Sequence, residues 1–247
     1  MDHLPEDIKK IAQCTESGNK MKKIAVVCTS RNRLKNATRC YEHFLKNTSD
    51  QSDFYLIIRQ DEKDLYSPLE CNKIIVSNSV RYGMSDPLNE GVNQILNKQW
   101  YDHFYFLGDD HVIQTQNWDT IFLNYLSTVK NNIGIVYGND LLRKDQLPTA
   151  CLVSSKIIKE LGYMCYPKLC HLYIDNYWKD LGLGCGILKY FDDVIIEHFH
   201  YANKKSEMDE NYQKVNARSL YASDGKIYKE WHARERLHEI AKIKGLL

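Results

Sequence analysis

The chain contains the stretch His103-Phe104-Tyr105-Phe106-Leu107-Gly108-Asp109-Asp110-His111, an apolar run that leads into a glycine and two adjacent carboxylates. A continuous apolar run is typical of a strand that is buried on both faces of a parallel sheet. Open α/β sheets bind ligands in the crevice at the carboxyl ends of such strands. We therefore expect Asp109 and Asp110 to lie in a ligand-binding crevice.

The adjacent carboxylates of Asp109 and Asp110 repel each other unless a cation lies with them. Oxygen ligands suit Mg²⁺ or Mn²⁺, and either ion can bridge a diphosphate. The stretch therefore indicates a metal and diphosphate site, with an exposed Asp-Asp turn as the alternative.

Length, charge and cysteine content set the outer limits. The chain has 247 residues, 43% of them apolar and 26% charged, with a formal net charge of +1. These values suit a globular protein of one large or two small domains, with no general attraction to nucleic acid or acidic membranes. The sequence has no apolar segment of the roughly 18 residues that a membrane span needs, no signal-peptide pattern, and eight cysteines without a C-x-x-C pair. We expect reduced thiols and a cytoplasmic protein.

Further strands and helices surround the opening stretch. Apolar runs predict strands over 24–28, 54–58, 73–77 and 133–137, and helical spacing predicts helices over 34–45, over 87–98 with Asp86 as N-cap, and after an N-cap at Asn117. This alternation predicts an α/β fold with a mostly parallel sheet and helices on both faces. Right-handed crossovers then bring the loops after the strands to one rim.

Arginines follow the first two strands, in Thr29-Ser30-Arg31-Asn32-Arg33 and in Arg59-Gln60-Asp61-Glu62. Arginines at the ends of strands indicate that an anion binds there. The chain has neither a G-x-G-x-x-G motif nor a Walker A loop. A phosphate would therefore be held by metal and arginine rather than by a glycine-rich loop.

The second half of the chain offers an acidic residue beside aromatic rings. If residues 171–180 form a helix, His171, Asp175 and Trp178 share one face. Such a face presents an acid or base next to a ring that can stack on a sugar. The alternative is an amphipathic helix with an exposed aspartate.

A strand over 193–201 would place His198 and His200 on the same face as Ile196, with Glu197 on the other. The two histidines together, or one alone, could then reach a metal. Residues 203–247 are rich in Lys, Glu and Tyr, and 230–244 has the pattern of an amphipathic helix. This segment either packs on the domain as a solvated helix or forms a lid over a phosphate ligand.

In these features the chain resembles glycosyltransferases of the GT-A fold, close to glycosyltransferase family 2 and its small phage and bacterial members. The resemblance rests on the Thr29-Ser30-Arg31-Asn32-Arg33 loop, Arg81 with Asn89 and Gly91, Asp109-Asp110, and Glu197-His198-Phe199-His200, and covers roughly residues 22–212. Two positions depart from the family pattern. His111 stands where many relatives have aspartate, and Ile174-Asp175 replaces the usual Glu-Asp pair.

The resemblance implies one GT-A, Rossmann-like domain over 22–202, with a nucleotide-sugar half (22–112) and an acceptor half (113–202). An N-terminal extension (1–21) would precede this domain, and a C-terminal helical segment (203–247) would follow it. The implied reaction moves a hexose from a nucleotide diphosphate sugar, a UDP-sugar, to an acceptor hydroxyl, with Mn²⁺ or Mg²⁺ as cofactor.

Carried over to this chain, the family's roles fall on named residues. The nucleotide-sugar would be bound by Thr29, Arg31, Asp61, Arg81, Asn89 and Asp109, with Asp109 on the ribose or the metal. The metal would be held by Asp110 and His198, with His200 as the second candidate. The acceptor would meet Asp175 as the base of an inverting mechanism, with His171 and Trp178 as binding residues.

Three other functions fit parts of the same pattern: a nucleotidyltransferase, a metal-dependent hydrolase, and a non-catalytic nucleotide- or carbohydrate-binding protein. A nucleotidyltransferase would use the same aspartate and metal chemistry, but no glycine-rich loop with a lysine follows the first strand. The acceptors open at this point are a saccharide, a lipid-linked sugar, a protein or a modified nucleobase. The oligomeric state is equally open.

Overall fold

A computed structural model describes residues 23–71 and 73–247. The predicted N-terminal extension therefore lies outside the described residues. At the centre is an eight-stranded sheet with the order β3-β2-β1-β4-β7-β6-β8-β5. The strands are β1 (Ile24–Thr29), β2 (Ser52–Arg59), β3 (Ile74–Ser77), β4 (His103–Gly108), β5 (His111–Ile113), β6 (Ile135–Asn139), β7 (Cys151–Ser154) and β8 (Leu188–His198).

The helices are α2 (Leu34–Asn47), α3 (Ser85–Leu96), α4 (Trp118–Leu126), α5 (Ser155–Leu161), α6 (Ile174–Cys185), α7 (Glu210–Val215), α8 (Arg218–Arg234) and α9 (Arg236–Leu246). The pairs β1–β2, β1–β4, β2–β3 and β6–β8 are parallel. Strand β7 is antiparallel to β4 and β6, and β5 is antiparallel to β8. The predicted α/β fold with a mostly parallel sheet is confirmed.

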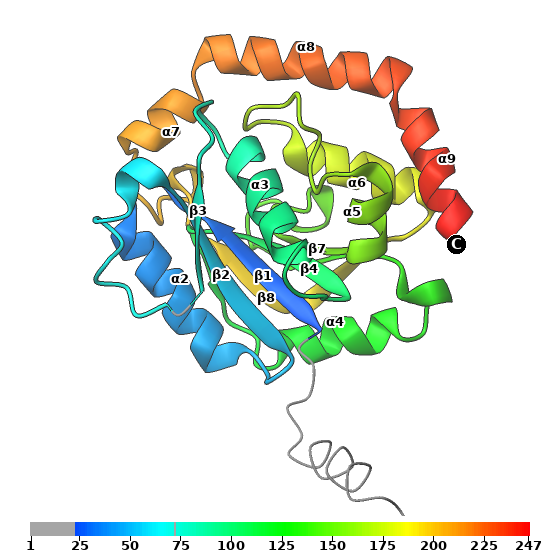
Figure 1. The fold of residues 1–247 in the computed structure, drawn as a ribbon, viewed down its shortest axis with the longest axis horizontal. Helices are drawn as coiled ribbons and strands as arrows, with labels where there is room; N and C mark the ends of the chain where they lie inside the picture. Colours follow the sequence, from blue (N-terminus) through cyan, green and yellow to red (C-terminus); the bar gives the residue numbers. More distant parts are fainter. Residues whose placement is uncertain (1–22, 72) are drawn as a thin grey trace, which may run out of the picture.

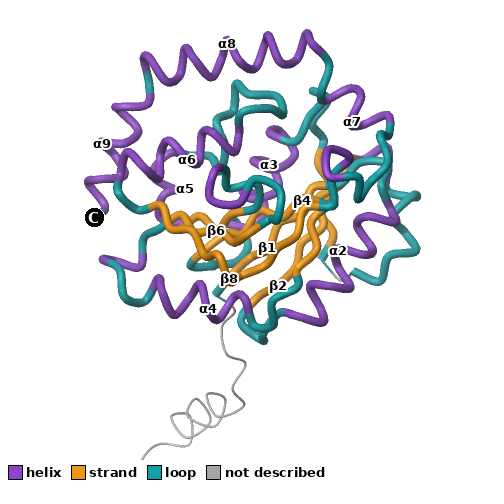
Figure 2. Tube along the Cα trace, turned by 180° about the vertical axis from the view of Figure 1, so that it is seen from behind, coloured by secondary structure: helices purple, strands orange, loops and turns teal. Residues whose placement is uncertain are grey.

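Helices cover both faces of the sheet, as predicted, because successive strand residues point to opposite sides. Ala25 and Val27 of β1 belong to a core that includes residues of α3, α5 and α6. Ile24 and Val26 belong to a second core with residues of α2 and α4. Figure 1 shows the two sets of helices on either side of the strands, and Figure 2 shows the same layers from behind.

Of the two predicted N-caps, Asp86 is wrong and Asn117 is confirmed in position only. Asp86 lies within the first turn of α3 instead of capping it, because its carboxylate pairs with Arg81 and the helix begins at Ser85. Asn117 precedes α4 as predicted, but its left-handed backbone (φ 53°) leaves its side chain without a capping hydrogen bond. The predicted end of α5 is confirmed, since Gly162 adopts the left-handed conformation that ends many helices (φ 87°).

Three boundaries in the second half differ from the sequence prediction. Helix α6 begins at Ile174, because Tyr173 is left-handed (φ 63°), so His171 lies in the loop before the helix. Strand β8 ends at His198, and His200 lies in the following turn. The helix predicted over 230–244 is two helices, α8 and α9, which meet at Glu235.

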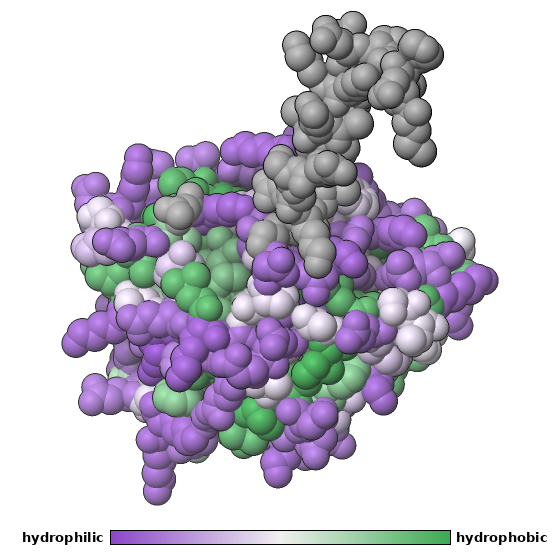
Figure 3. All heavy atoms as spheres, turned by 90° about the horizontal axis from the view of Figure 1, so that it is seen from below, coloured by the Kyte–Doolittle hydropathy of each residue, from purple (hydrophilic) through white to green (hydrophobic). Residues whose placement is uncertain are grey.

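The seven cysteines in the described part of the chain are free thiols, as predicted. Among the described helices, none combines the length and the apolar character that crossing a membrane requires. Figure 3 shows hydrophilic residues over much of one face, with separate apolar patches between them.

Candidate active site

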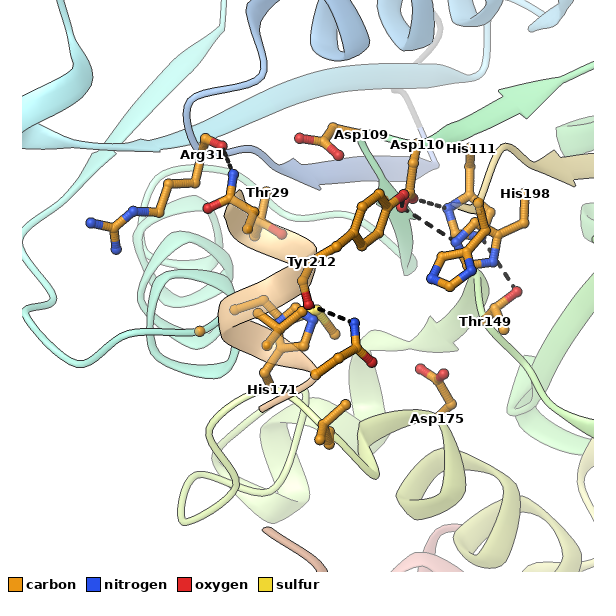
Figure 4. Close-up of a pocket in the computed structure, with 18 of the residues that line it drawn as sticks. Thr29, Arg31, Asp109, Asp110, His111, Thr149, His171, Asp175, His198 and Tyr212 are labelled. Carbon is orange, nitrogen blue, oxygen red and sulfur yellow. Dashed lines mark hydrogen bonds and ion pairs between the residues drawn. The ribbon is translucent and has the colours of Figure 1, made fainter. Parts of the chain in front are cut away.

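The strand ends open into a cavity of about 440 Å³, within the size range of small-molecule sites. Figure 4 shows how residues from distant parts of the chain point into it. Of the residues predicted for a site, the cavity is lined by Thr29, Arg31, Asp109, Asp110, His171, Asp175, His198 and His200. The predicted rim at the carboxyl ends of the strands therefore coincides with the cavity.

Asp109 is held by residues of the loop after β1. Its carboxylate accepts a hydrogen bond from Ser30 Oγ at 2.7 Å and one from Arg33 Nη1 at 3.3 Å. Burial raises the pKa of Asp109 to about 7, although Arg33 acts in the opposite direction, and the neighbouring Asp110 adds to the increase. The ionisation of Asp109 therefore depends on the charged groups beside it, such as Arg33 and Asp110.

Asp110 meets two histidines from the strands β5 and β8. Its Oδ1 is 3.2 Å from His111 Nδ1, and its Oδ2 is 3.3 Å from His198 Nε2. One ligand atom from each of these three residues lies within 4.8 Å of the others. Antiparallel pairing of β5 with β8 places His111 directly opposite His198, so their rings stack with centroids 4.2 Å apart.

The charges of this cluster are mutually dependent. Burial opposes the ionisation of Asp110, but the imidazoles of His198 and His111 outweigh it, so the pKa of Asp110 lies well below its usual range. Burial also opposes the charge on His198, but Asp110 and Asp140 outweigh it and raise the pKa of His198 to about 10. A carboxylate with two imidazoles is a donor set that fits a divalent transition metal.

Gly108 allows the cluster to form. A Cβ atom at this position would lie 2.7 Å from His111 Nδ1 and 2.8 Å from Asp110 Oδ1. Any larger residue would therefore displace the two side chains from each other. The glycine quoted at the end of the β4 sequence thus has a packing role at the site.

The sequence prediction missed His111, Asp140 and Thr149. Asp140 follows β6, is only 3% exposed, and accepts a hydrogen bond from Thr149 Oγ1 at 2.8 Å. Its Oδ2 is 3.8 Å from His198 Nδ1, on the side of the ring that faces away from Asp110. The position of His111 after Asp109-Asp110 was a usable signal, whereas Asp140 and Thr149 reach the site only through the fold.

The C-terminal segment also contributes to the site. The hydroxyl of Tyr212 in α7 donates a hydrogen bond to Asp110 Oδ2 at 2.8 Å. Arg33 lies over the Tyr212 ring, 4.0 Å from its centroid, and donates two hydrogen bonds to Asp209, at 2.6 and 2.7 Å. The charge of Arg33 is thus shared between the site carboxylates and the segment that covers them.

Asp175 lies across the cavity from the cluster of Asp110, His111 and His198, on the first turn of α6 (Figure 4). No hydrogen bond from another described residue reaches its carboxylate, which lines the cavity. Burial raises the pKa of Asp175 to about 7, and Asp140 and Asp110 add to the increase although His198 opposes it. A carboxylate with this pKa in an open cavity has the properties of a general base.

Two further histidines line the cavity. Burial lowers the pKa of His171 and that of His200, each to about 4, and the charge of His198 contributes for His200. His200 Nδ1 accepts a hydrogen bond from the backbone of Ala202 at 3.2 Å, and so caps the next turn. His200 is not part of the three-residue cluster with Asp110.

Four predicted site residues do not line the cavity, namely Asp61, Arg81, Asn89 and Trp178. Asp61 is exposed, in the 3₁₀ turn after β2. Arg81 binds Asp86 and the carbonyls of residues 167–169, while Asn89 bonds to the backbone of Met164 and Cys165. The polar groups of Arg81 and Asn89 are therefore bonded within the protein itself.

Trp178 is also placed differently from its prediction. The ring is fully buried in the core, and its Nε1 donates a hydrogen bond to the Met164 carbonyl at 2.9 Å. His171 does not share a helix face with it, because α6 begins only at Ile174. Trp178 therefore has no free face for stacking on a ligand, whereas the rings of Tyr173 and Tyr221 line the cavity.

Comparison with known proteins identifies the fold. No protein-family model matches the sequence, and no curated protein matches it significantly. Solved structures do match, including TarS residues 1–349 from S. aureus in complex with UDP, with 10% identity and a TM-score of 0.54. The alignment covers 87% of this chain and 73% of the TarS chain.

Two other matches have bound metal. A mannosyltransferase from Pyrobaculum calidifontis with GDP-Man and Mn²⁺ has 9% identity and a TM-score of 0.53, over 91% of this chain and 73% of its own. Glucosyl-3-phosphoglycerate synthase from Mycobacterium tuberculosis with Mn²⁺ and UDP has 13% identity and a TM-score of 0.51, over 91% of this chain and 87% of the synthase chain. The chain therefore has the GT-A, Rossmann-like fold.

Proposed function

We propose that this protein is a metal-dependent glycosyltransferase that moves a hexose from a nucleotide diphosphate sugar, a UDP-sugar, to an acceptor hydroxyl. The observation that carries the proposal is the pairing of two chemically different sides in one cavity. Asp110 and His198 can hold a divalent cation on one side, and the unpartnered Asp175 lies across from them. The structural neighbours support this reading, since their complexes contain UDP or GDP-Man together with Mn²⁺ or Mg²⁺.

The donor side would be formed by the loop after β1. Thr29 and Arg31 line the cavity beside Asp109, where a nucleotide would lie. When bound, Mn²⁺ or Mg²⁺ neutralises the charge that develops on the leaving diphosphate. Asp110 and His198 would hold the ion, and Arg33, which is 3.3 Å from Asp109, adds a positive charge close by.

The acceptor side would be formed by α6 and the loop before it. In an inverting reaction, Asp175 takes the proton of the acceptor hydroxyl as that oxygen bonds to the anomeric carbon of the sugar. The bond between this carbon and the diphosphate oxygen breaks, and its electron pair leaves with the nucleoside diphosphate. The raised pKa of Asp175 suits this step, because a base with a pKa near the working pH transfers protons most effectively.

The alternative functions differ from this proposal in which residues of the site they would need. A nucleotidyltransferase needs no base at the position of Asp175, and a binding protein needs no metal beside an open carboxylate. A hydrolase would use the same residues with water as the acceptor. The exposed Tyr221 at the cavity wall favours a ring-containing acceptor such as a sugar, because aromatic rings stack on such groups.

The proposal is tested by thermal denaturation with nucleotides and nucleotide-sugars, each with and without Mn²⁺. A ligand that binds only the folded state stabilises it, by about 2.7 kcal/mol at a hundredfold excess over Kd. We expect a UDP compound to raise the Tm only when Mn²⁺ is present. Asp110→Asn should lose this shift, while Asp61→Asn, which changes an exposed carboxylate outside the cavity, should keep it. If no nucleoside diphosphate shifts the Tm with Mn²⁺, the proposal is wrong.

A further inference from the structure

His111 has an unpaired ring nitrogen at the cluster. The residue is 2% exposed, and its Nδ1 has no hydrogen-bond partner among the described residues, although Asp110 Oδ1 lies 3.2 Å away. A buried polar atom without a partner is costly, and is rare unless a ligand or ion satisfies it. The position of this nitrogen beside a carboxylate oxygen points to a cation between them.

The hydrogen bonds behind His111 determine which of its nitrogens carries the proton. Thr149 donates its only hydroxyl proton to Asp140 Oδ2 at 2.8 Å. In its contact with His111 Nε2, at 3.3 Å, the Thr149 oxygen must therefore accept. Neutral His111 then carries its proton on Nε2, which leaves a lone pair on Nδ1 directed toward Asp110.

Asp140 acts on His198 in a corresponding way. Its Oδ2 lies 3.8 Å from His198 Nδ1 and favours a proton on that nitrogen, which leaves Nε2, 3.3 Å from Asp110, available to a metal. Asp140 is itself fixed, because its Oδ1 accepts hydrogen bonds from the backbone of Leu142, Arg143 and Lys144 at 2.9, 2.6 and 2.8 Å. One rigid carboxylate thus lies behind both imidazoles.

We infer that His111 is a third metal ligand, through Nδ1, and that Asp140 and Thr149 are positioning residues that orient His111 and His198 toward the ion. Carboxylate partners behind metal-bound histidines are a general feature of such sites. Two imidazoles with one carboxylate suit a transition metal better than Mg²⁺, which prefers oxygen ligands. The site should therefore bind Mn²⁺ more tightly than Mg²⁺.

The test measures metal binding directly, by calorimetry with Mn²⁺ and with Mg²⁺ on the whole chain without nucleotide. Thr149→Val removes the hydroxyl at nearly constant shape and should weaken Mn²⁺ binding about 10-fold to 100-fold, the range typical of such partners. Thr149→Ser keeps the hydroxyl and should bind Mn²⁺ within about twofold of the parent. His111→Gln should lose more affinity than Thr149→Val.

A second readout separates positioning from general destabilisation. The ¹⁵N shifts of the histidine rings report which nitrogen is protonated. In Thr149→Val the His111 ring should lose its preference for a proton on Nε2, while the Tm of Thr149→Ser serves as the folding control. Unchanged ring shifts, or Mn²⁺ affinity within twofold of the parent in both Thr149→Val and His111→Gln, would overturn the inference.

The inference refines the metal site of the proposed function, but the two can fail separately. Mn²⁺ binding that depends on His111 and Thr149, without any nucleotide binding, would support the metal site and contradict the transferase. Mn²⁺-dependent nucleotide binding that is unchanged by substitution of either residue would support the transferase and contradict the inferred roles of His111 and Thr149.

Discussion

The hydroxyl of Tyr212 in α7 donates a hydrogen bond at 2.8 Å to Asp110, the carboxylate that also contacts His111 and His198. This contact joins a C-terminal helix to the loop after β4, 102 residues earlier in the chain. This contact identifies the part of the segment 203–247, predicted as a possible lid, that lies at the cavity. Residues of α7 and Tyr221 at the start of α8 line the cavity, whereas the rest of α8 and α9 contribute Trp231, Ile240 and Ile243 to the core.

Weakening the contact of this segment with Arg33 should increase its motion. Asp209→Asn removes the charge that pairs with Arg33 but keeps a good N-cap for α7. We expect about 1 kcal/mol less protection, roughly fivefold faster amide exchange, in residues 209–216 with α8 and α9 unchanged. Hydrogen exchange followed by mass spectrometry measures this. Glu210→Gln, on the exposed neighbour, is the control, and equal exchange in both variants would contradict the role of Asp209.

Asp175 should be needed for transfer but not for donor binding. Asp175→Asn keeps the shape of the side chain and removes the base, so the transfer rate should fall by about 10² to 10⁴. The Mn²⁺-dependent Tm shift with nucleotide should remain, because the metal cluster is untouched. Full transfer activity in Asp175→Asn, alongside an inactive Asp110→Asn, would remove Asp175 from the mechanism.

The pH dependence of the reaction follows from the same carboxylate. Asp175 has a pKa raised to about 7, mainly by burial, and must be deprotonated to act as a base. The value of kcat/KM should therefore be constant above about pH 7 and fall about tenfold for each pH unit below it. Steady-state rates between pH 5.5 and 8.5 test this, and a flat profile across that range would speak against Asp175 as the base.

Trp178 should matter for stability and not for the acceptor. Trp178→Phe leaves a void in the core and removes the hydrogen bond to the Met164 carbonyl. We expect a loss of about 2 to 4 kcal/mol in the free energy of unfolding, measured with urea. The KM for the acceptor should not change. A raised acceptor KM at unchanged stability would restore the sequence-based assignment of Trp178 to acceptor binding.

The sequence predicted the parts of the fold that rest on local pattern. The continuous apolar runs of β1, β2 and β4 mark buried strands whatever surrounds them. Strand β5 has three residues, too few for a period to show, and exists because a distant segment, β8, pairs with it. The confirmed elements are thus those that need no tertiary information.

The same distinction applies to the site. Asp109 and Asp110 follow a recognisable strand, so their position in the cavity could be predicted. Asp140 and Thr149 have no local signature, and they matter only because β6, β7 and β8 bring them behind the histidines. The sequence equally gave no sign that Asn89 would be bound to the backbone of Met164 and Cys165.

The central claim is that the cavity transfers a sugar from a nucleotide diphosphate sugar with the help of a divalent cation. Its most direct test is the release of nucleoside diphosphate from a panel of UDP- and GDP-sugars with Mn²⁺, measured for the parent protein and for Asp110→Asn. Slow transfer to water is enough for detection. We predict release that requires Mn²⁺ and falls by about 10² to 10³ in Asp110→Asn. Absence of release from every donor, or equal release by Asp110→Asn, would contradict the account.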